Sequence, residues 1–192
     1  MKKIEIPNVL TLFRIFMIPV FLVFVFLGDG NSVFYRWTSM AIFLTVSLTD
    51  ILDGYLARKW NVVSNFGSLM DPLADKMLVC SALIFLTSIG AIPAWMVIII
   101  VCREFWVTAL RQLALERGRN VISASFWGKL KTISQITMIS TRLAGLHRYD
   151  ILGAYSAHLA EFILWFSVVA TIVSGAFYTR DYFAAQSDNH EK

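Results

Sequence analysis

Four aspartates in one short stretch of an apolar chain are the residues best placed to do chemistry. Asp50 and Asp53 are three residues apart, and Asp71 and Asp75 are four residues apart. On helices, both spacings put the members of a pair on one face. At membrane depth each carboxylate would cost about 2.5–3.5 kcal/mol, and like charges add repulsion. The cluster therefore predicts that positive charge is bound between the two pairs.

Divalent cations fit this set of side chains best. Ligation by carboxylate oxygens alone suits Mg²⁺ or Mn²⁺, and four aspartates can bridge two ions. Two metal ions about 4 Å apart can hold the attacking and leaving oxygens of a displacement at phosphorus. The predicted cofactors are therefore two divalent cations, Mg²⁺ or Mn²⁺, serving phosphoryl chemistry.

The neighbouring residues are compatible with a ligand at this place. Small residues would let a ligand approach the backbone, and they are Gly54, Ala57 and Gly67. Basic residues could neutralise part of the acidic charge or could reach outward to water, and they are Arg58, Lys59 and Lys76.

Purely structural interpretations exist for three of the acids. Asp71 precedes Pro72 and could be a helix N-cap with proline at the first helical position. Asp50 and Asp53 could form an ion pair with Arg58. Asp75, one turn after Asp71, has no comparable structural explanation.

An ion carrier or channel is an alternative class of function, because paired aspartates can line an ion path. All four aspartates lie toward one predicted membrane side, and Glu161 is the one acid in the predicted fifth and sixth helices. The pattern therefore favours an enzyme. Glu161 is three residues from His158, and a hydrogen bond between them is a better interpretation than a catalytic role.

The elements that must position these residues are membrane helices. The 192 residues are 57% hydrophobic and 16% charged, and the mean hydropathy is +0.65, whereas soluble domains carry about 25% charged residues. With roughly 20 apolar residues needed per span, the chain has room for about six spans. The prediction is an all-α integral membrane protein with one domain over residues 1–185 and a polar tail over 186–192. Cys80 and Cys102 fall in apolar runs and are expected to be packed thiols.

Hydrophobic runs and breaks predict the boundaries of the helices. The expected helices are 7–28, 34–59, 71–90, 93–117, 126–146 and 152–179. Basic residues accumulate in the segments that lie inside if the N-terminus is inside, while Arg36, Arg142 and Arg148 fall in the outer segments. Both termini are therefore expected in the cytoplasm. The net charge of +4 is explained by this topology and implies no nucleic-acid partner.

The first helix begins with a polar stripe of Asn8, Thr11 and Arg14. Two interpretations remain open: the opening turns lie in the membrane interface, or Arg14 is a snorkelling residue with ordinary polar neighbours. The lysines before this helix resemble the start of a signal peptide, but Pro7, Asn8 and Arg14 interrupt the apolar run. We expect a retained first segment.

The complete pattern is Asp50-x-x-Asp53-Gly54-x-x-Ala57-Arg58, eight residues, then Gly67-x-x-x-Asp71-x-x-x-Asp75. It resembles the signature of the CDP-alcohol phosphotransferases and matches it at every position. That resemblance implies a membrane enzyme that moves a phosphatidyl or similar group from a CDP-linked donor to an alcohol and releases CMP. It also implies six transmembrane helices, a polar cavity open to the cytoplasm and a homodimer in the bacterial cytoplasmic membrane.

The resemblance also implies roles for individual residues. Asp50, Asp53 and Asp71 would bind metal and the donor diphosphate, and Asp75 would bind the second metal and act as general base. The pocket for cytidine diphosphate would be shaped by Gly54, Ala57, Arg58 and Gly67. The donor's phosphate and glycerol backbone would lie beside Asn8, Thr11 and Arg14.

The segments "CREFWVTALRQLALERGRN" and "FWGKLKT" hold more basic residues than anchoring requires. Arg111 and Lys129, with Arg103, are predicted to bind the phosphate of an acceptor. Arg103 is ambiguous because Glu104 is adjacent and Asp75 or another acid could be its partner. Positive-inside anchoring accounts for Lys131, Arg117 and Arg119 at least as well.

These segments and the opening "IPNVLTLFRIFMIPV" resemble family members that transfer from CDP-diacylglycerol to glycerol 3-phosphate. Glycerol 3-phosphate is therefore the expected acceptor. Serine, inositol phosphate and phosphatidylglycerol are the alternatives, and a serine enzyme would need no phosphate site.

Overall fold

The computed structural model of the chain describes residues 5–28, 32–60, 65–117, 126–146 and 154–187, and it describes the side chains of all of these except 5–11, 50–72, 75, 154 and 185–187. Within this part the chain is helical and contains no strand. The helices are α1 (Glu5–Gly28), α2 (Val33–Trp60), α3 (Asn65–Ser88), α4 (Ala94–Glu116), α5 (Phe126–Ala144) and α6 (Ala154–Ser187). The predicted number and order of helices are confirmed.

Two helix boundaries differ from the prediction by more than two residues. α3 begins at Asn65, not at residue 71, so Pro72 lies inside the helix. Pro72 is therefore not at the first position of a helix. A helix packed among other helices can tolerate an internal proline, because neighbouring groups form hydrogen bonds with the backbone group that proline leaves without a partner. α6 continues beyond residue 179 because Tyr178 and Tyr182 are buried against α4.

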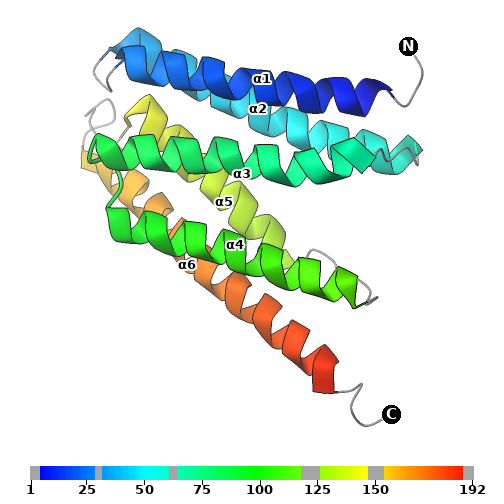
Figure 1. Cartoon of the computed structure of the whole chain (residues 1–192). Helices are drawn as coiled ribbons and strands as arrows, with labels where there is room; N and C mark the ends of the chain where they lie inside the picture. The colour runs from blue at the N-terminus through cyan, green and yellow to red at the C-terminus, as the bar shows by residue number, and fades with distance from the viewer. Residues whose placement is uncertain (1–4, 29–31, 61–64, 118–125, 147–153, 188–192) are drawn as a thin grey trace.

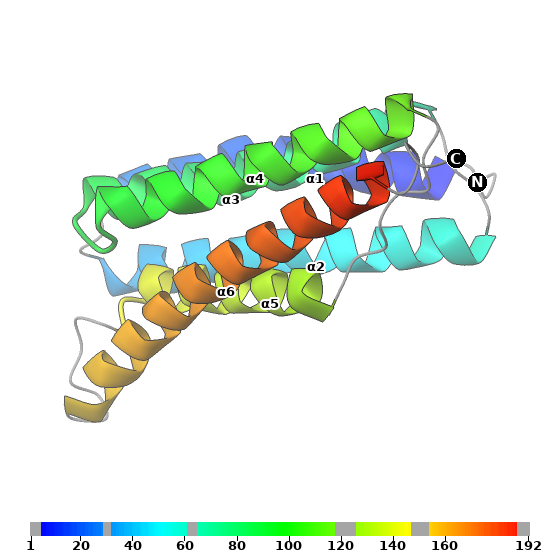
Figure 2. The same ribbon diagram turned by 90° about the horizontal axis from the view of Figure 1, so that it is seen from below.

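The six helices form a closed ring. α1 packs on α2, α2 on α5, α5 on α6, α6 on α4, α4 on α3, and α3 returns to α1. In Figure 2 the ring appears as two layers, with α1, α3 and α4 in one and α2, α5 and α6 in the other. Consecutive helices therefore need not be neighbours, and the contact between α2 and α5 joins distant parts of the chain.

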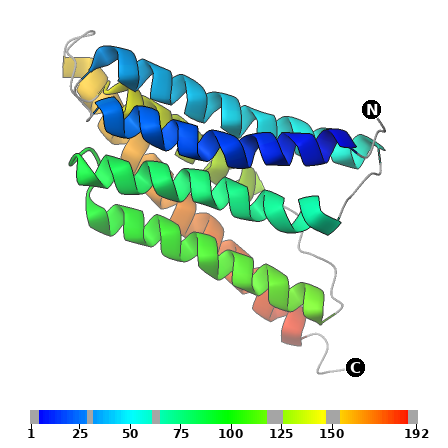
Figure 3. The ribbon, with the colours of Figure 1, turned by 45° about the horizontal axis from the view of Figure 1, so that its top comes forward.

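The starts of α1 and α3 and the ends of α2, α4 and α6 all lie at the same end of the bundle (Figures 1 and 3). We call it the terminus end. The turn between α3 and α4 lies at the opposite end, where Gly90 has a positive φ of 70°. Its N–H donates to the carbonyl of Thr87 at 3.0 Å, and the N–H of Ala91 donates to that of Leu86 at 2.8 Å. This hydrogen-bonded end of α3 reverses the chain within five residues.

The core receives a fully buried apolar side chain from each helix. All six are at most 1% exposed, and they are Phe21, Phe43, Leu83, Ile100, Met138 and Leu164. Removing one large apolar side chain from such a core typically costs 2–5 kcal/mol. This packing fixes the positions of the helices that carry the candidate site.

Two buried arginines hold the opposite end together. Arg36 on α2 donates to the carbonyl of Ala144, the last residue of α5, at 2.6 Å. Arg142 on α5 is 3% exposed and binds Glu161 of α6 at 2.7 Å. These arginines, predicted to lie in outer segments, therefore join helices that are distant in sequence.

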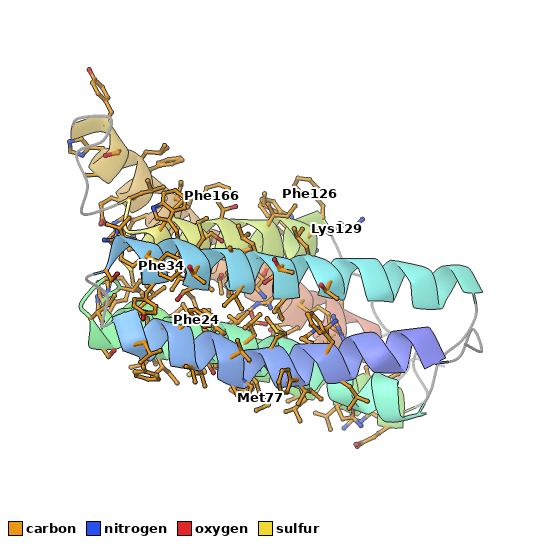
Figure 4. The ribbon with its side chains drawn as sticks, turned by 90° about the horizontal axis from the view of Figure 1, so that it is seen from above. Phe24, Phe34, Met77, Phe126, Lys129 and Phe166 are labelled. Atoms are coloured by element: carbon orange, nitrogen blue, oxygen red, sulfur yellow. The ribbon has the colours of Figure 1, made fainter. Side chains whose placement is uncertain are left out.

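Large apolar side chains cover much of the outer surface. Phe34 on α2, Phe126 on α5 and Phe166 on α6 point away from the ribbons in Figure 4, and their exposed fractions are 68%, 72% and 42%. In the part of the chain that the structure describes, Tyr155–Ala184 meets the length and hydropathy of a membrane span. Shorter apolar stretches cover Leu12–Gly28 and Lys76–Ser88.

Candidate active site

The four aspartates lie on two neighbouring helices at the terminus end. Asp50 and Asp53 are in the second half of α2, and Asp71 and Asp75 are in the first half of α3. The two helices contact each other, and Figure 1 shows these parts of both ribbons in the half of the bundle nearer the terminus end. Both stretches are helical, as the pairing on one face requires. Asp71 is the seventh residue of α3, so the N-cap interpretation is wrong.

The side chains of these aspartates lie outside the described part of the structure, and so do those of Asn8, Thr11, Gly54, Ala57, Arg58 and Gly67. Their backbones are helical, on α1, α2 and α3. Among the side chains that are described, no group of three or more His, Cys, Asp or Glu could hold a metal ion. The aspartate set on α2 and α3 stays the predicted metal site, because its all-carboxylate composition suits Mg²⁺ or Mn²⁺.

Arg14 lies inside the bundle. It is 1% exposed and sits on α1, which packs on both α2 and α3. A snorkelling arginine would reach water, so that interpretation is wrong. A buried guanidinium is stable only beside acids or other acceptors.

A second charged cluster joins α4 and α5. The carboxylate oxygen Oε1 of Glu104 accepts a hydrogen bond from Arg103 Nη1 at 3.2 Å and lies 2.5 Å from Lys131 Nζ. The exposed fractions of the Arg103, Glu104 and Lys131 side chains are 13%, 16% and 9%. Explaining Lys131 by membrane anchoring is wrong, because its side chain is buried and ion-paired. Among the described residues, the acid that pairs with Arg103 is Glu104.

Two residues of α6 contact the side chain of Arg103. Ser174 Oγ accepts a hydrogen bond from Arg103 Nη2 at 2.7 Å, and a β-carbon at Gly175 would lie 3.0 Å from Arg103 Cγ. One turn away, Gln135 of α5 donates to Thr171 Oγ1 at 3.1 Å. Polar groups of α4, α5 and α6 thus meet in one seam, whose α5 and α6 residues are buried and whose α4 residues are partly buried.

The other predicted acceptor residues lie around this seam. Arg111 is exposed on α4, with its guanidinium carbon 5.9 Å from the ring centre of Tyr178. Lys129 is exposed near the start of α5 and extends away from the ribbon in Figure 4. Arg103 and Arg111 therefore both face α6, whereas Lys129 lies near the start of α5.

The match to known families covers most of the chain. Residues 4–173 match the model of the CDP-alcohol phosphatidyltransferase family. The chain belongs to this family. The family predicted from the aspartate signature is confirmed.

Relatives of this CDP-alcohol phosphatidyltransferase are similar over most of their length. A CDP-diacylglycerol–glycerol-3-phosphate 3-phosphatidyltransferase of Bacillus subtilis is 39% identical, over 96% of this chain and 99% of its own. A probable phosphatidylglycerophosphate synthase of Mycobacterium tuberculosis is 40% identical, over 91% and 79%. A Haemophilus influenzae enzyme named like the B. subtilis one is 36% identical, over 90% of each chain.

Sequence reasoning named Glu104 only as a neighbour of Arg103, and it missed the pairing of Glu104 with Lys131 and the contact of Ser174 with Arg103 in the phosphatidyltransferase's polar interior. A usable signal was present, since Glu104 is an acid in the middle of a predicted apolar helix. Ser167, Thr171 and Ser174 also follow helical spacing on α6, and all three are buried. Which partners they meet depends on the order of the helices in the ring.

Proposed function

We propose that this CDP-alcohol phosphatidyltransferase moves the phosphatidyl group of CDP-diacylglycerol to glycerol 3-phosphate, giving phosphatidylglycerol phosphate and CMP. The observation that carries the proposal is the similarity, over at least 90% of this chain, to relatives named for this reaction. The complete aspartate signature on α2 and α3 supports it, because it supplies the acids that the chemistry requires.

Asp75 is the proposed general base. The acceptor hydroxyl oxygen attacks the phosphorus next to the diacylglycerol, the bond from that phosphorus to the CMP oxygen breaks, and the hydroxyl proton passes to the Asp75 carboxylate. Counting 13 residues back from Ser88 and 13 forward from Ala94 puts Asp75 level with Val107, since antiparallel helices rise about 1.5 Å per residue. That depth lies between Arg103 and Arg111.

Asp50, Asp53 and Asp71 are proposed to hold divalent cations and the donor diphosphate, with Asp75 completing the set. When bound, two cations, Mg²⁺ or Mn²⁺, offset the diphosphate charge and make the acceptor hydroxyl more acidic. The nucleotide pocket is assigned to Gly54, Ala57, Arg58 and Gly67. Backbone room at the small residues and the charge of Arg58 suit a nucleoside diphosphate.

The donor's phosphate and glycerol backbone are assigned to Asn8, Thr11 and Arg14. The burial of Arg14 supports this role. Counting 14 residues on each side of the α1–α2 connection puts it level with Ser47, about one turn from Asp50. The acceptor phosphate is assigned to Arg111, Lys129 and Arg103.

The proposed setting is a bacterial cytoplasmic membrane, with six spans, both termini and a polar cavity on the cytoplasmic side, and a homodimeric assembly. Helices of 19 to 34 residues would be about 28–51 Å long, compared with a hydrocarbon core of about 30 Å. The exposed aromatic side chains described above support contact with lipid. The terminus end would then face the cytoplasm.

The test is CMP release by the purified chain in detergent micelles that contain CDP-diacylglycerol and Mg²⁺. Glycerol 3-phosphate, serine and inositol phosphate are supplied in separate reactions. We expect release with glycerol 3-phosphate alone. Release with a different alcohol alone would retain the aspartate chemistry and overturn the acceptor, whereas no release with any of the three would overturn the function.

A further inference from the structure

A groove of about 270 Å³ runs between α2 and α5. The two helices pack on each other and lie in the same layer of the bundle in Figure 2. Side chains of both helices line the groove, among them Trp37, Met40, Leu44, Thr137, Ser140 and Thr141. Because Trp37 and Thr137 are exposed, the groove opens to the outer surface of the bundle, which faces lipid if the helices span the membrane as proposed.

The groove offers its occupant an apolar surface. The three hydroxyl groups on its α5 side, those of Thr137, Ser140 and Thr141, donate to carbonyls of α5 itself at 2.7–2.9 Å. A hydroxyl has one proton to donate, so none of the three has a donor left for a ligand. On the α2 side, Met40 and Leu44 present apolar side chains. The groove therefore suits a hydrocarbon chain and not a polar headgroup.

The groove leads toward the proposed donor site. Leu48 is 55% exposed and follows Leu44 by one turn, so it continues the apolar face of α2 toward the terminus end. The glycerol backbone of the donor is proposed to lie beside Arg14, which is level with Ser47. From Ser47 to Trp37 is ten residues of α2, or about 15 Å. One acyl chain fills about the same length, half of a hydrocarbon core of about 30 Å.

We propose that the groove between α2 and α5 holds one acyl chain of the CDP-linked donor lipid, and that Trp37 at its far end limits the length of chain that fits. This inference rests on the proposed function, which supplies the donor. It names the part of the protein that selects the donor's acyl chain, at a distance from the aspartates that act on its diphosphate.

The test obstructs the far half of the groove with Thr141→Trp. Arg36 is bonded to Ala144, so Thr141, three residues before Ala144, is level with Ser39, about 12 Å beyond Ser47. A tryptophan there would occupy the place of a long chain and leave room for a short one. We expect the KM for CDP-dipalmitoylglycerol to rise about fivefold or more while the KM for CDP-dihexanoylglycerol stays within about twofold. A merely structural effect would change both constants together.

Thr45→Trp is the matched control. Thr45 is an exposed threonine of α2 whose hydroxyl also donates within its own helix, to the carbonyl of Ala41 at 2.8 Å, but it lies outside the groove. We expect neither KM to change in this variant. A KM for the long-chain donor that rises equally in both variants would overturn the proposal.

Failure of the inference can be told from failure of the proposed function. If the wild-type protein releases no CMP from either donor with glycerol 3-phosphate, the proposed function fails. If it does and Thr141→Trp leaves both KM values unchanged, the groove assignment alone is overturned, and a changed oligomeric mass of this variant would assign the groove to a second copy of the chain.

A second variant keeps the inference testable if Thr141→Trp is not monodisperse in detergent. Trp37→Ala lengthens the groove at its far end. We expect kcat/KM for CDP-diarachidoylglycerol, which has longer chains, to rise relative to kcat/KM for CDP-dipalmitoylglycerol. An unchanged ratio would overturn the proposal.

Discussion

Gly145 and Arg36 approach each other so closely that a β-carbon on the glycine would overlap the guanidinium. Gly145 follows the last residue of α5 with a φ of 73°, a conformation that favours glycine. Arg36 uses this space to reach the carbonyl of Ala144. The glycine therefore allows the backbone conformation that ends α5, and it leaves room for the hydrogen bond that joins α5 to α2.

Gly145→Ala is expected to lower the thermal stability of the protein in detergent. The backbone strain alone costs about 1–2 kcal/mol, and displacement of Arg36 adds the loss of a buried hydrogen bond. Gly90→Ala is the control, because Gly90 has a similar φ of 70° with nothing within 4 Å of a new β-carbon. Equal melting temperatures for the two variants would contradict the role of Arg36.

Arg142→Ala should destabilise the protein much more than Arg180→Ala. Arg142 is 3% exposed, and its loss would remove its hydrogen bond to the Ala160 carbonyl and leave a cavity between α5 and α6; truncating a large buried side chain costs about 2–5 kcal/mol. Arg180 binds Asp181 at 2.9 Å but is 69% exposed, and such pairs contribute about 0–1 kcal/mol. Thermal melting of both variants in one detergent measures the difference.

Asp75→Asn should leave the protein folded and able to bind CDP-diacylglycerol while turnover falls by about 10²–10⁴-fold, since the amide cannot accept the acceptor's proton. Turnover is measured as CMP release at saturating Mg²⁺. Asp181→Asn is the control, because Asp181 is paired with Arg180 on α6, and its turnover should match that of the wild type. Near-normal turnover of Asp75→Asn would rule out the assigned base.

Arg111→Ala should raise the KM for glycerol 3-phosphate more than the KM for the donor. The exposed guanidinium lies beside Tyr178 and faces α6, where it can reach an acceptor phosphate. Lys129→Ala in the same assay shows whether the lysine at the start of α5 contributes. An unchanged acceptor KM in Arg111→Ala would refute its role.

Removal of divalent cations with a chelator should abolish CMP release, and added Mg²⁺ or Mn²⁺ should restore it, because the aspartate set requires positive charge to bind a diphosphate. The melting temperature is measured alongside activity. Turnover that persists at full rate in excess chelator would contradict the metal assignment.

Local patterns predicted the helices and the placement of the aspartates, because hydrophobic runs, glycines and charge positions are properties of short segments. They did not predict that Arg14 is buried or that Lys131 meets Glu104. Both results depend on which helices become neighbours, and the ring order places α5 between α2 and α6. The start of α3 was wrong because an internal proline resembles a helix start.

The order of the helices separates the polar parts of the two substrates along the chain. The residues proposed to bind the donor's nucleotide, phosphates and glycerol backbone all lie on α1, α2 and α3. The residues proposed to bind the acceptor lie on α4 and α5, and the two arginines among them contact α6. Choice of alcohol and cleavage of the diphosphate are thus assigned to different halves of one polypeptide. Exchanging the second half between relatives would then redirect the enzyme to another alcohol while leaving its reaction with the nucleotide-linked lipid intact.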